Sequence, residues 1–257
     1  MKDFKIRCSA ISQIMGDLVG ITDIQLKELD TLQSKEKRTE KQQEKLNLLI
    51  TKKDTPTELS AGGKTHCENW YKEQLYSRKK EFSSKMTDKG MIMEDEAIDF
   101  VADHLNLGML LKNEKHFSNE YMKGTPDVIL PKLVIDTKCS WDCFTFPLFE
   151  TKINPIYYWQ GQGYMELTNR DNFKLIYVLL DTPAHLIKSE AWYFVKNNGY
   201  DELDEEMYQR FVDKMTYPNI SKRLKIKIYS FARNNDDIAK IKTQVEKCRK
   251  YLKTIKI

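Results

Sequence analysis

In the stretch GTPDVILPKLVIDTKCSW at 124–141, where Lys132 belongs to a predicted turn, three further charged side chains stand among the apolar residues of predicted strands. They are Asp127, Asp136 and Lys138, and the residues around the last two predict a strand over 133–138. Side chains alternate between the two faces of a strand, so Asp136 and Lys138 share one face. Asp127 begins the adjoining strand of a predicted hairpin and reaches the same end of it. The sequence therefore predicts two carboxylates and one ammonium at a single site.

A third carboxylate is expected at the same place. The segment 88–107 predicts a helix with an apolar stripe, and Glu94 falls on that stripe. Three carboxylates that face one another in a partly buried cleft are costly, and each raises the pKa of the others. A divalent cation relieves both problems. Carboxylate and carbonyl oxygens are the ligands that suit Mg²⁺ or Mn²⁺.

A metal ion held this way can activate water and stabilise charge on a phosphoryl group, and two ions can clamp the attacking and leaving oxygens. Lys138 can orient or deprotonate that water, or neutralise the transition state. The acid-x-Lys pattern also occurs at 3–5 and 150–152, but neither copy follows a Pro-Asp at hairpin distance. The alternative interpretation is a salt-bridged hairpin on an exposed sheet face.

Composition sets wide limits on the kind of protein. Of the 257 residues, 40% are hydrophobic, which supports a packed core and argues against disorder. The net charge of +4 permits a nucleic-acid partner without requiring one. No apolar run approaches the roughly 20 residues of a membrane helix, and the first ten residues lack the apolar core of a signal peptide. The five scattered cysteines indicate a reduced, cytoplasmic protein.

The order of predicted elements favours a mixed sheet with helices against it. We expect strands at 116–124, 127–130, 133–138, 173–181, 190–196 and 223–231, and helices at 66–82, 88–107, 154–168, 204–215 and 235–253. Gly161 and Gly163 lie inside the helix predicted at 154–168, where each costs about 1 kcal/mol relative to alanine. Something must therefore approach that helix closely.

A strongly charged segment lies near the start of the chain. Eight of the eleven residues at 35–45 are charged, both signs are mixed, and leucines flank the run. This pattern predicts a helical hairpin or one long projecting helix. Its role is open between a solvated surface and an arm that binds DNA or a partner.

The spacing of the charged residues resembles that of the PD-(D/E)xK nuclease superfamily, with Pro126-Asp127 followed by Asp136-Thr137-Lys138. Within that superfamily the chain looks most like the phage-type alkaline exonucleases of the YqaJ and lambda exonuclease group. GMIMEDEA at 90–97 resembles the family helix Gly-x-x-x-Glu-x-x-Ala. YYWQGQGYMELT at 157–168 resembles its glutamine-containing helix, DTKCSW its catalytic strand, and CSAISQIMG, loosely, a segment near the 5′-phosphate pocket.

The resemblance implies an α/β (α+β) fold with a restriction-endonuclease-like core, in which helices flank a mixed central sheet. It implies a single nuclease domain over 1–257, made of a helical region (1–89, with the charged insertion 27–53), a catalytic core (90–200) and a helix–strand–helix (201–257). The insertion has no counterpart in a minimal member. Only Cys248 lies near the C-terminus, so we expect no iron–sulfur cluster.

The resemblance also assigns a catalytic set. Asp127, Asp136 and Glu94, together with the carbonyl of Thr137, would hold Mg²⁺ or Mn²⁺, with two ions expected per site. Many relatives carry glutamate in place of Asp136, and the shorter side chain changes its reach. Lys138 would assist the nucleophile.

Five further residues receive roles from the same resemblance. Gln160 would orient the lysine or a phosphate, and Tyr164, one turn later, would pack or contact a DNA strand. Thr125 would donate to the scissile phosphate. Ser12 and Arg7 would bind the 5′-terminal phosphate or play a plain structural role.

The implied activity is digestion of linear double-stranded DNA from the 5′ end, which leaves a 3′ single strand. Phage relatives pass that strand to an annealing protein for recombination, and some close a ring of three subunits around DNA. A phage-encoded member would work in the host cytoplasm. The alternatives are an endonuclease of the same fold, a non-catalytic DNA-binding module and an unrelated metal-dependent hydrolase.

Overall fold

The computed structural model describes residues 3–16, 21, 23–54, 58–80 and 84–256. The chain forms two compact units. The smaller comprises 1–6, 10–80 and 236–257, and the larger comprises 7–9 and 81–235. The single nuclease domain expected over 1–257 stays a prediction. Among the helices of the described residues, none has the length and apolar character needed to cross a membrane.

The larger unit is built on a four-stranded mixed sheet of order β4–β5–β6–β7. Its strands are β4 (Val128–Ile129), β5 (Leu133–Cys139), β6 (Asn172–Val178) and β7 (Ile226–Ala232). β5 runs antiparallel to β4 and parallel to β6, while β6 and β7 are antiparallel. The mixed sheet and its helices confirm the predicted fold class.

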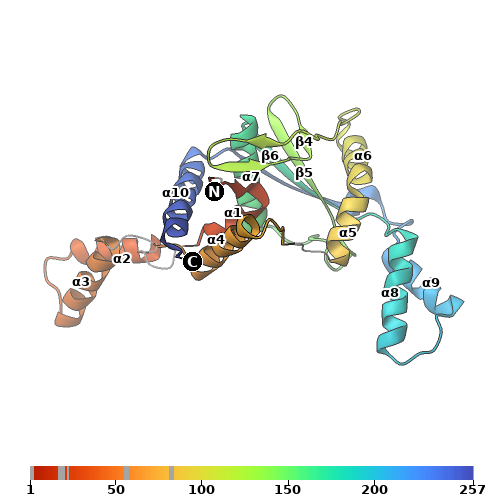
Figure 1. Ribbon diagram of the computed structural model, residues 1–257, viewed down its shortest axis with the longest axis horizontal. Coiled ribbons are helices and arrows are strands. Elements are labelled where there is room, and N and C mark those ends of the chain that lie inside the picture. The colour runs from red at the N-terminus through yellow and green to blue at the C-terminus, as the bar shows by residue number, and fades with distance from the viewer. Residues whose placement is uncertain (1–2, 17–20, 22, 55–57, 81–83, 257) are drawn as a thin grey trace. The chain divides into compact units, whose positions relative to one another are not determined.

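One face of this sheet packs against α6 (Glu94–Leu105). Ile98 and Val101 of α6 lie in one core cluster with Ile135 of β5 and Ile176 of β6. Figure 1 shows α6 beside the strands of this sheet. The single helix predicted at 88–107 is in fact two, α5 (Lys85–Ile92) and α6, which break at Met93. The apolar spacing continues through the break, so periodicity alone does not reveal it.

The opposite face packs against α7 (Pro155–Thr168), as predicted for 154–168. The side chain of Asn154 caps the helix by accepting a hydrogen bond from the backbone of Ile156, and Pro155 occupies the first turn. A Cβ added to Gly161 would lie 2.6 Å from Cζ of Phe231 and 2.8 Å from Cδ1 of Phe173. The close approach expected at this glycine is therefore present.

A small second sheet has the order β1–β3–β2, with β1 at Ile6–Arg7. The strand predicted at 116–124 is two short antiparallel strands, β2 (Phe117–Ser118) and β3 (Met122–Gly124). Between them the Asn119 side chain accepts hydrogen bonds from the backbone of Tyr121 and Met122, both at 2.9 Å. This side-chain turn splits the expected strand.

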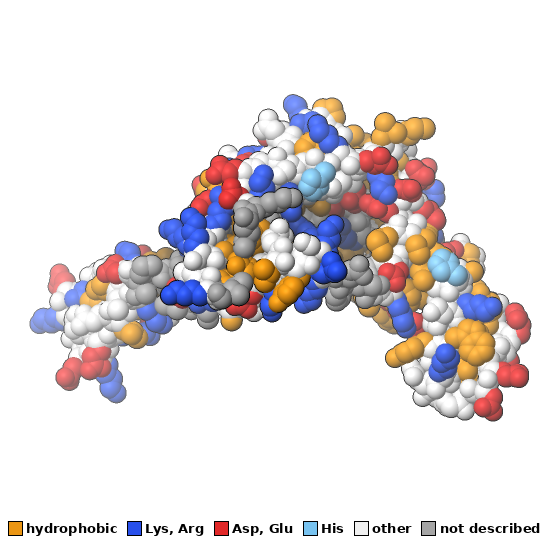
Figure 2. All heavy atoms as spheres, in the orientation of Figure 1, with side chains coloured by type: hydrophobic (Ala, Val, Ile, Leu, Met, Phe, Trp, Pro, Cys, Tyr) orange, Lys and Arg blue, Asp and Glu red, His pale blue; other side chains and the backbone are white. Residues whose placement is uncertain are grey.

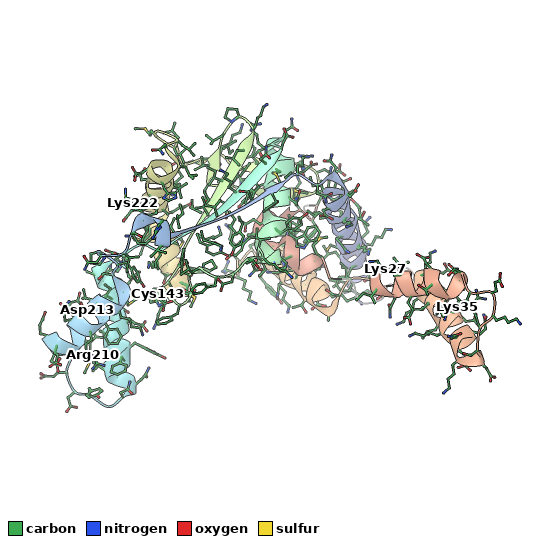
Figure 3. All side chains as sticks on the ribbon, turned by 180° about the vertical axis from the view of Figure 1, so that it is seen from behind. Lys27, Lys35, Cys143, Arg210, Asp213 and Lys222 are labelled. Carbon is green, nitrogen blue, oxygen red and sulfur yellow. The ribbon has the colours of Figure 1, made fainter. Side chains whose placement is uncertain are left out.

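The strand predicted at 190–196 is wrong, because these residues belong to the helix α8 (Ala184–Asn197). The aromatic run AWYF suggested a strand, yet the buried residues Ile187, Ala191 and Val195 recur every four positions. α8 pairs with α9 (Glu205–Met215), which begins at the Asp204 cap, and Phe194 packs on Phe211 at 5.6 Å. Figure 3 labels Arg210 and Asp213 on α9.

The smaller unit is helical. It contains α1 (Ile11–Ile14), α2 (Asp23–Gln33), α3 (Glu40–Asp54), α4 (Ala61–Leu75) and nearly all of α10 (Asn235–Thr254). Two 3₁₀ turns, η1 (Cys8–Ala10) and η2 (Lys222–Leu224), complete the chain's regular structure within the described residues. α4 starts inside the predicted break at 55–65, because Ser60 caps it by accepting from the backbone of Gly63. Residues 55–57 of that break lie outside the described residues.

The charged segment forms a helical hairpin, α2 with α3, which is one of the two predicted forms. Leucines from both helices form its own small core, namely Leu29, Leu32, Leu46 and Leu49. Figure 2 shows side chains of both charge signs mixed over its surface, and Figure 3 labels Lys27 and Lys35 on it. The sheet and its two covering helices, rather than this hairpin, position the predicted charged residues.

Candidate active site

The hairpin β4–β5 fixes the first carboxylate. Asp127 directly precedes β4, and the register that pairs Val128 with Ile135 brings it beside 136–137. Thr137 donates two hydrogen bonds to Asp127 Oδ2, one from its backbone N–H (2.7 Å) and one from Oγ1 (3.0 Å). Asp127 Oδ1 can therefore serve as a ligand without breaking either bond.

Asp136 and Lys138 form the centre of the site. The Asp136 side chain is 1% exposed, and its Oδ2 is ion-paired with the Lys138 ammonium. Lys138 Nζ also donates a hydrogen bond to the carbonyl oxygen of Thr137 at 3.2 Å. The ammonium thus lies between a carboxylate oxygen and a backbone carbonyl, which is an environment suited to a cation.

The electrostatics of this pair follow from burial and crowding. Burial raises the pKa of Asp136 to about 7, Lys138 opposes the rise, and the charges of Asp127 and Glu94 add to it. Burial works against the Lys138 ammonium, but the carboxylates of Asp136 and Asp127 outweigh it and raise the lysine pKa. Lys138 therefore stays charged at neutral pH.

Helix α7 supplies the amide predicted from the sequence. Gln160 Nε2 donates to Asp136 Oδ1 at 3.3 Å and to the hydroxyl of Tyr164 at 3.1 Å, and both side chains are buried. The contact of Gly161 with the sheet brings Gln160 down onto β5. A Cβ on Gly124 would lie 2.7 Å from the Tyr164 ring, so Tyr164 is closely packed as well.

Sequence reasoning missed Tyr157. Its ring lies 5.5 Å from Lys138 Nζ, close enough for a cation–π interaction. The signal was present, because Tyr157, Gln160 and Tyr164 recur at i, i+3 and i+7 and therefore share one face of α7.

Glu94 is the first residue of α6, and its side chain is 31% exposed. Lys112 Nζ bonds to Glu94 and to Asp95, at 3.0 Å each. The negative charge of Glu94 nevertheless contributes to the raised pKa of Asp136, so it acts on the site electrostatically. The partnership with Lys112 had no sequence signal, since the two residues lie in different segments.

The remaining predicted residues lie in different places. Thr125 is exposed, and its Oγ1 is 3.1 Å from His116 Nδ1. Arg7 is exposed and belongs to the larger unit, while half-buried Ser12 belongs to the smaller unit. The structure therefore gathers the predicted residues that precede β4 or lie on β5 and α7. Among the predicted site residues that the structure describes, these alone make a connected polar cluster.

A buried lysine that sequence reasoning also missed lies at the end of β5. Lys89 of α5 donates to the carbonyl oxygens of Trp141 (2.9 Å) and Leu180 (2.8 Å), which follow β5 and β6. Burial lowers the pKa of this lysine, and the charges of nearby acidic groups partly offset that decrease. It ties together the two strand ends beyond Lys138.

The donor set fits a hard divalent cation. Within the described residues no three His, Cys, Asp or Glu side chains are close enough to hold a metal by themselves, so Glu94 does not join the two aspartates in such a group. Asp127, Asp136 and the Thr137 carbonyl nevertheless offer oxygen ligands around the position that the Lys138 ammonium borders. Mg²⁺ suits such a site because it keeps several waters and takes few carboxylates.

Comparison with solved structures supports a nuclease. A phage-related exonuclease from Haemophilus somnus 129PT is 26% identical, with a TM-score of 0.70, over 98% of this chain and 94% of that one. An alkaline exonuclease from Laribacter hongkongensis, LHK-Exo, is 13% identical with a TM-score of 0.52, over 97% and 88% of the two chains. Its complex with dAMP matches at 14% identity and a TM-score of 0.53.

The sequence matches no known family profile and no curated protein. The similarity to LHK-Exo shows the fold alone. The similarity to the phage-related exonuclease extends over nearly the full length of both chains, and it confirms the resemblance to this exonuclease group.

Proposed function

We propose that this protein is a metal-dependent exodeoxyribonuclease, which digests linear double-stranded DNA from the 5′ end and leaves a 3′ single strand. The observation that carries the proposal is the buried Asp136 carboxylate paired with the half-buried Lys138, beside Asp127 and Gln160, within a fold shared along its length with a phage-related exonuclease. Chemistry on a phosphodiester explains why an ammonium and two carboxylates are kept together in a partly buried place.

Each residue of the cluster has a role in that proposal. Asp127, Asp136 and the Thr137 carbonyl would hold Mg²⁺ or Mn²⁺, and Glu94 would serve a second ion. When bound, the metal supplies Lewis-acid stabilisation of the phosphoryl oxygens and an activated water. Lys138 orients the attacking water or offsets negative charge at the phosphorus. Gln160 holds the Asp136 carboxylate in one orientation through its amide.

The nucleic-acid partner is a DNA end. The structure of LHK-Exo has been solved in complex with dAMP. Because this chain shares that fold, we propose that it binds nucleotides as well. Contacts with phosphates would come from its lysines and would weaken with added salt. The same proposal includes three further points. The protein would act with an annealing protein in phage recombination, it would form a ring of three subunits, and it would work in the host cytoplasm.

The test uses linear duplex labelled at either the 5′ or the 3′ end, beside covalently closed circles, with Mg²⁺ or with chelator. We expect rapid release of 5′ label as mononucleotide, intact circles and no digestion in chelator. Asp136→Asn and Lys138→Met should each lose more than about a hundredfold in rate. Asp3→Asn, in another Asp-x-Lys triplet, is the matched control and should digest normally.

Two results would replace the proposal. Cleaved circles would identify an endonuclease. Binding of DNA without cleavage in either Mg²⁺ or Mn²⁺ would identify a DNA-binding module.

A further inference from the structure

The sheet face that carries the catalytic pair continues across β6 and β7. Lys138 of β5 is the register partner of Tyr177 in β6, which in turn is the partner of Lys227 in β7. Register partners point to the same face of a sheet, as do residues two apart along a strand. Tyr177, Lys227 and Tyr229 therefore lie on the face of Asp136 and Lys138.

A row of tyrosine rings leads away from Lys138 on this face. Tyr157, whose ring borders the ammonium, meets Tyr177 edge to face with centroids 6.0 Å apart. Tyr177 meets Tyr229 in the same manner at 6.1 Å. Three aromatic rings in succession thus connect the catalytic lysine to the edge strand β7.

A cavity of about 430 Å³ opens at the far end of the row. Tyr177 and Tyr229 form one wall, and the segment 147–155, which joins the catalytic strand to α7, forms the other. The volume lies within the ~300–1,000 Å³ of small-ligand sites. Figure 3 labels Cys143 in the chain that leads from β5 toward this segment.

The cavity wall is held in place by hydrogen bonds to β7. The Tyr229 hydroxyl donates to the carbonyl of Glu150 at 2.9 Å, and Lys227 Nζ donates to the carbonyl of Leu148 at 3.2 Å. These bonds fasten the connecting segment to the sheet, so the cavity is formed without a ligand. Preorganisation of this kind favours binding.

The lining has the chemistry of a nucleotide site. Tyrosine and proline faces (Pro147 and Pro155) offer flat apolar surfaces on which a base can stack. Lys152 offers an ammonium to a phosphate, while Glu150 can accept a hydrogen bond from the exocyclic amine of a base. The tyrosine row connects this cavity to the ammonium of Lys138, so a strand that occupies the cavity can continue toward the Asp136–Lys138 pair.

We propose that this tyrosine cavity binds one nucleotide of the DNA strand being cut, with its base against Tyr177 and Tyr229 and its phosphate near Lys152. The inference rests on the proposed function, because that function makes DNA the ligand. It adds a subsite that the catalytic residues do not specify. The stacking is independent of base identity, so the subsite positions the strand and does not select a sequence.

The test measures binding in chelator, where digestion is absent. The ligand is a short 5′-phosphorylated duplex in which one abasic position is moved stepwise through the 5′ strand. With the unmodified protein, one position should weaken binding by about tenfold, the effect of losing one stacked base. Tyr229→Leu should weaken binding of the intact duplex by a similar factor. The same variant should bind the intact duplex and the duplex with the abasic site at that position equally well.

Two variants serve as controls. Tyr229→Phe keeps the ring but loses the hydrogen bond to Glu150, so it should remain sensitive to the same abasic position even where its overall affinity falls. Tyr193→Leu removes an exposed tyrosine of α8 outside the cavity and should change nothing. Because the abasic series works on the unmodified protein, the test stands even if Tyr229→Leu does not fold.

Several outcomes overturn the inference. Equal binding at every abasic position is one such outcome. Another is that the losses in affinity caused by Tyr229→Leu and by the abasic site multiply when combined, because independent losses mean that the ring and the base do not contact each other. If Tyr229→Leu weakens binding of free dAMP while the abasic series is flat, the cavity takes released nucleotide and not the strand. Parallel digestion assays separate the two proposals: digestion without coupling refutes only the subsite, and coupling without digestion refutes only the nuclease.

Discussion

Replacing Gly161 with alanine tests whether α7 positions Gln160 by direct contact with the sheet. The added methyl group would lie 2.6 Å from Cζ of Phe231 and 2.8 Å from Cδ1 of Phe173. Ordinary carbon contacts need about 3.5–4.0 Å, so α7 must retreat from the sheet by about 1 Å. Phe173 is fully buried and cannot yield easily.

Two effects oppose each other in this variant. Alanine favours the helix by about 1 kcal/mol over glycine. Overpacking a close contact costs about 1–3 kcal/mol. We expect the second effect to win, because two aromatic rings resist the methyl group, with a net loss of roughly 1–2 kcal/mol in the free energy of unfolding.

The retreat of α7 should also weaken catalysis. The hydrogen bond from Gln160 to Asp136 is already 3.3 Å long, so a further shift breaks it. A displacement of about 1 Å near reacting groups can cost up to about a hundredfold in rate. Urea unfolding and release of 5′ label from linear duplex would measure the two losses.

Gly90→Ala is the matched control. It makes the same change inside a helix, but no atom lies within 4 Å of the new methyl group. It should raise stability by up to about 1 kcal/mol and leave the digestion rate unchanged. If Gly161→Ala behaves as Gly90→Ala does, the packing argument for the position of Gln160 is refuted.

Two further predictions concern buried charge and metal. Lys89→Met removes the donor to the carbonyls of Trp141 and Leu180, so it should cost about 1–3 kcal/mol of stability in urea unfolding at neutral pH. The pKa of Lys89 is lowered below 10.5 in the folded protein, so the unfolded chain binds the proton more tightly. The unmodified protein should therefore gain stability relative to Lys89→Met as pH rises toward 10.5, and a constant difference between the two would contradict the burial of a charged lysine. Mg²⁺ or Mn²⁺ at about ten times its dissociation constant should stabilise the protein by about 1.4 kcal/mol in a thermal shift measurement, and chelator should reverse it. Asp127→Asn should abolish that shift, while a shift of equal size in the variant would exclude Asp127 as a ligand.

Much of the site could be read from short-range patterns. The alternation along β5 placed Asp136 and Lys138 on one face, and the hairpin spacing brought Asp127 to them. Helical spacing set Gln160 and Tyr164 one turn apart, where a hydrogen bond now joins them. Such relations depend on neighbours within a few residues or across one turn, which the order of residues largely decides.

The errors arose where local patterns were ambiguous. The aromatic run at 190–196 has strong strand character, yet it forms the second half of α8, because packing against α9 favours the four-residue spacing of Ile187, Ala191 and Val195. The break at Met93 and the turn at Asn119 each cut one predicted element into two. A single backbone departure of this kind leaves hydrophobic periodicity unchanged.

The sequence by itself identified the residues of the site, Asp127, Asp136, Lys138 and Gln160. It also identified the strand β5 and the helix α7, which position them. Only the tertiary structure decided that Lys112 would pair with Glu94 and that Lys89 would bond the chain beyond two strand ends. It also decided that Tyr177 and Tyr229 would extend the sheet face of Asp136 and Lys138. These contacts join segments far apart in the chain. They depend on how whole elements pack, and packing is a property of the folded molecule that no local pattern contains.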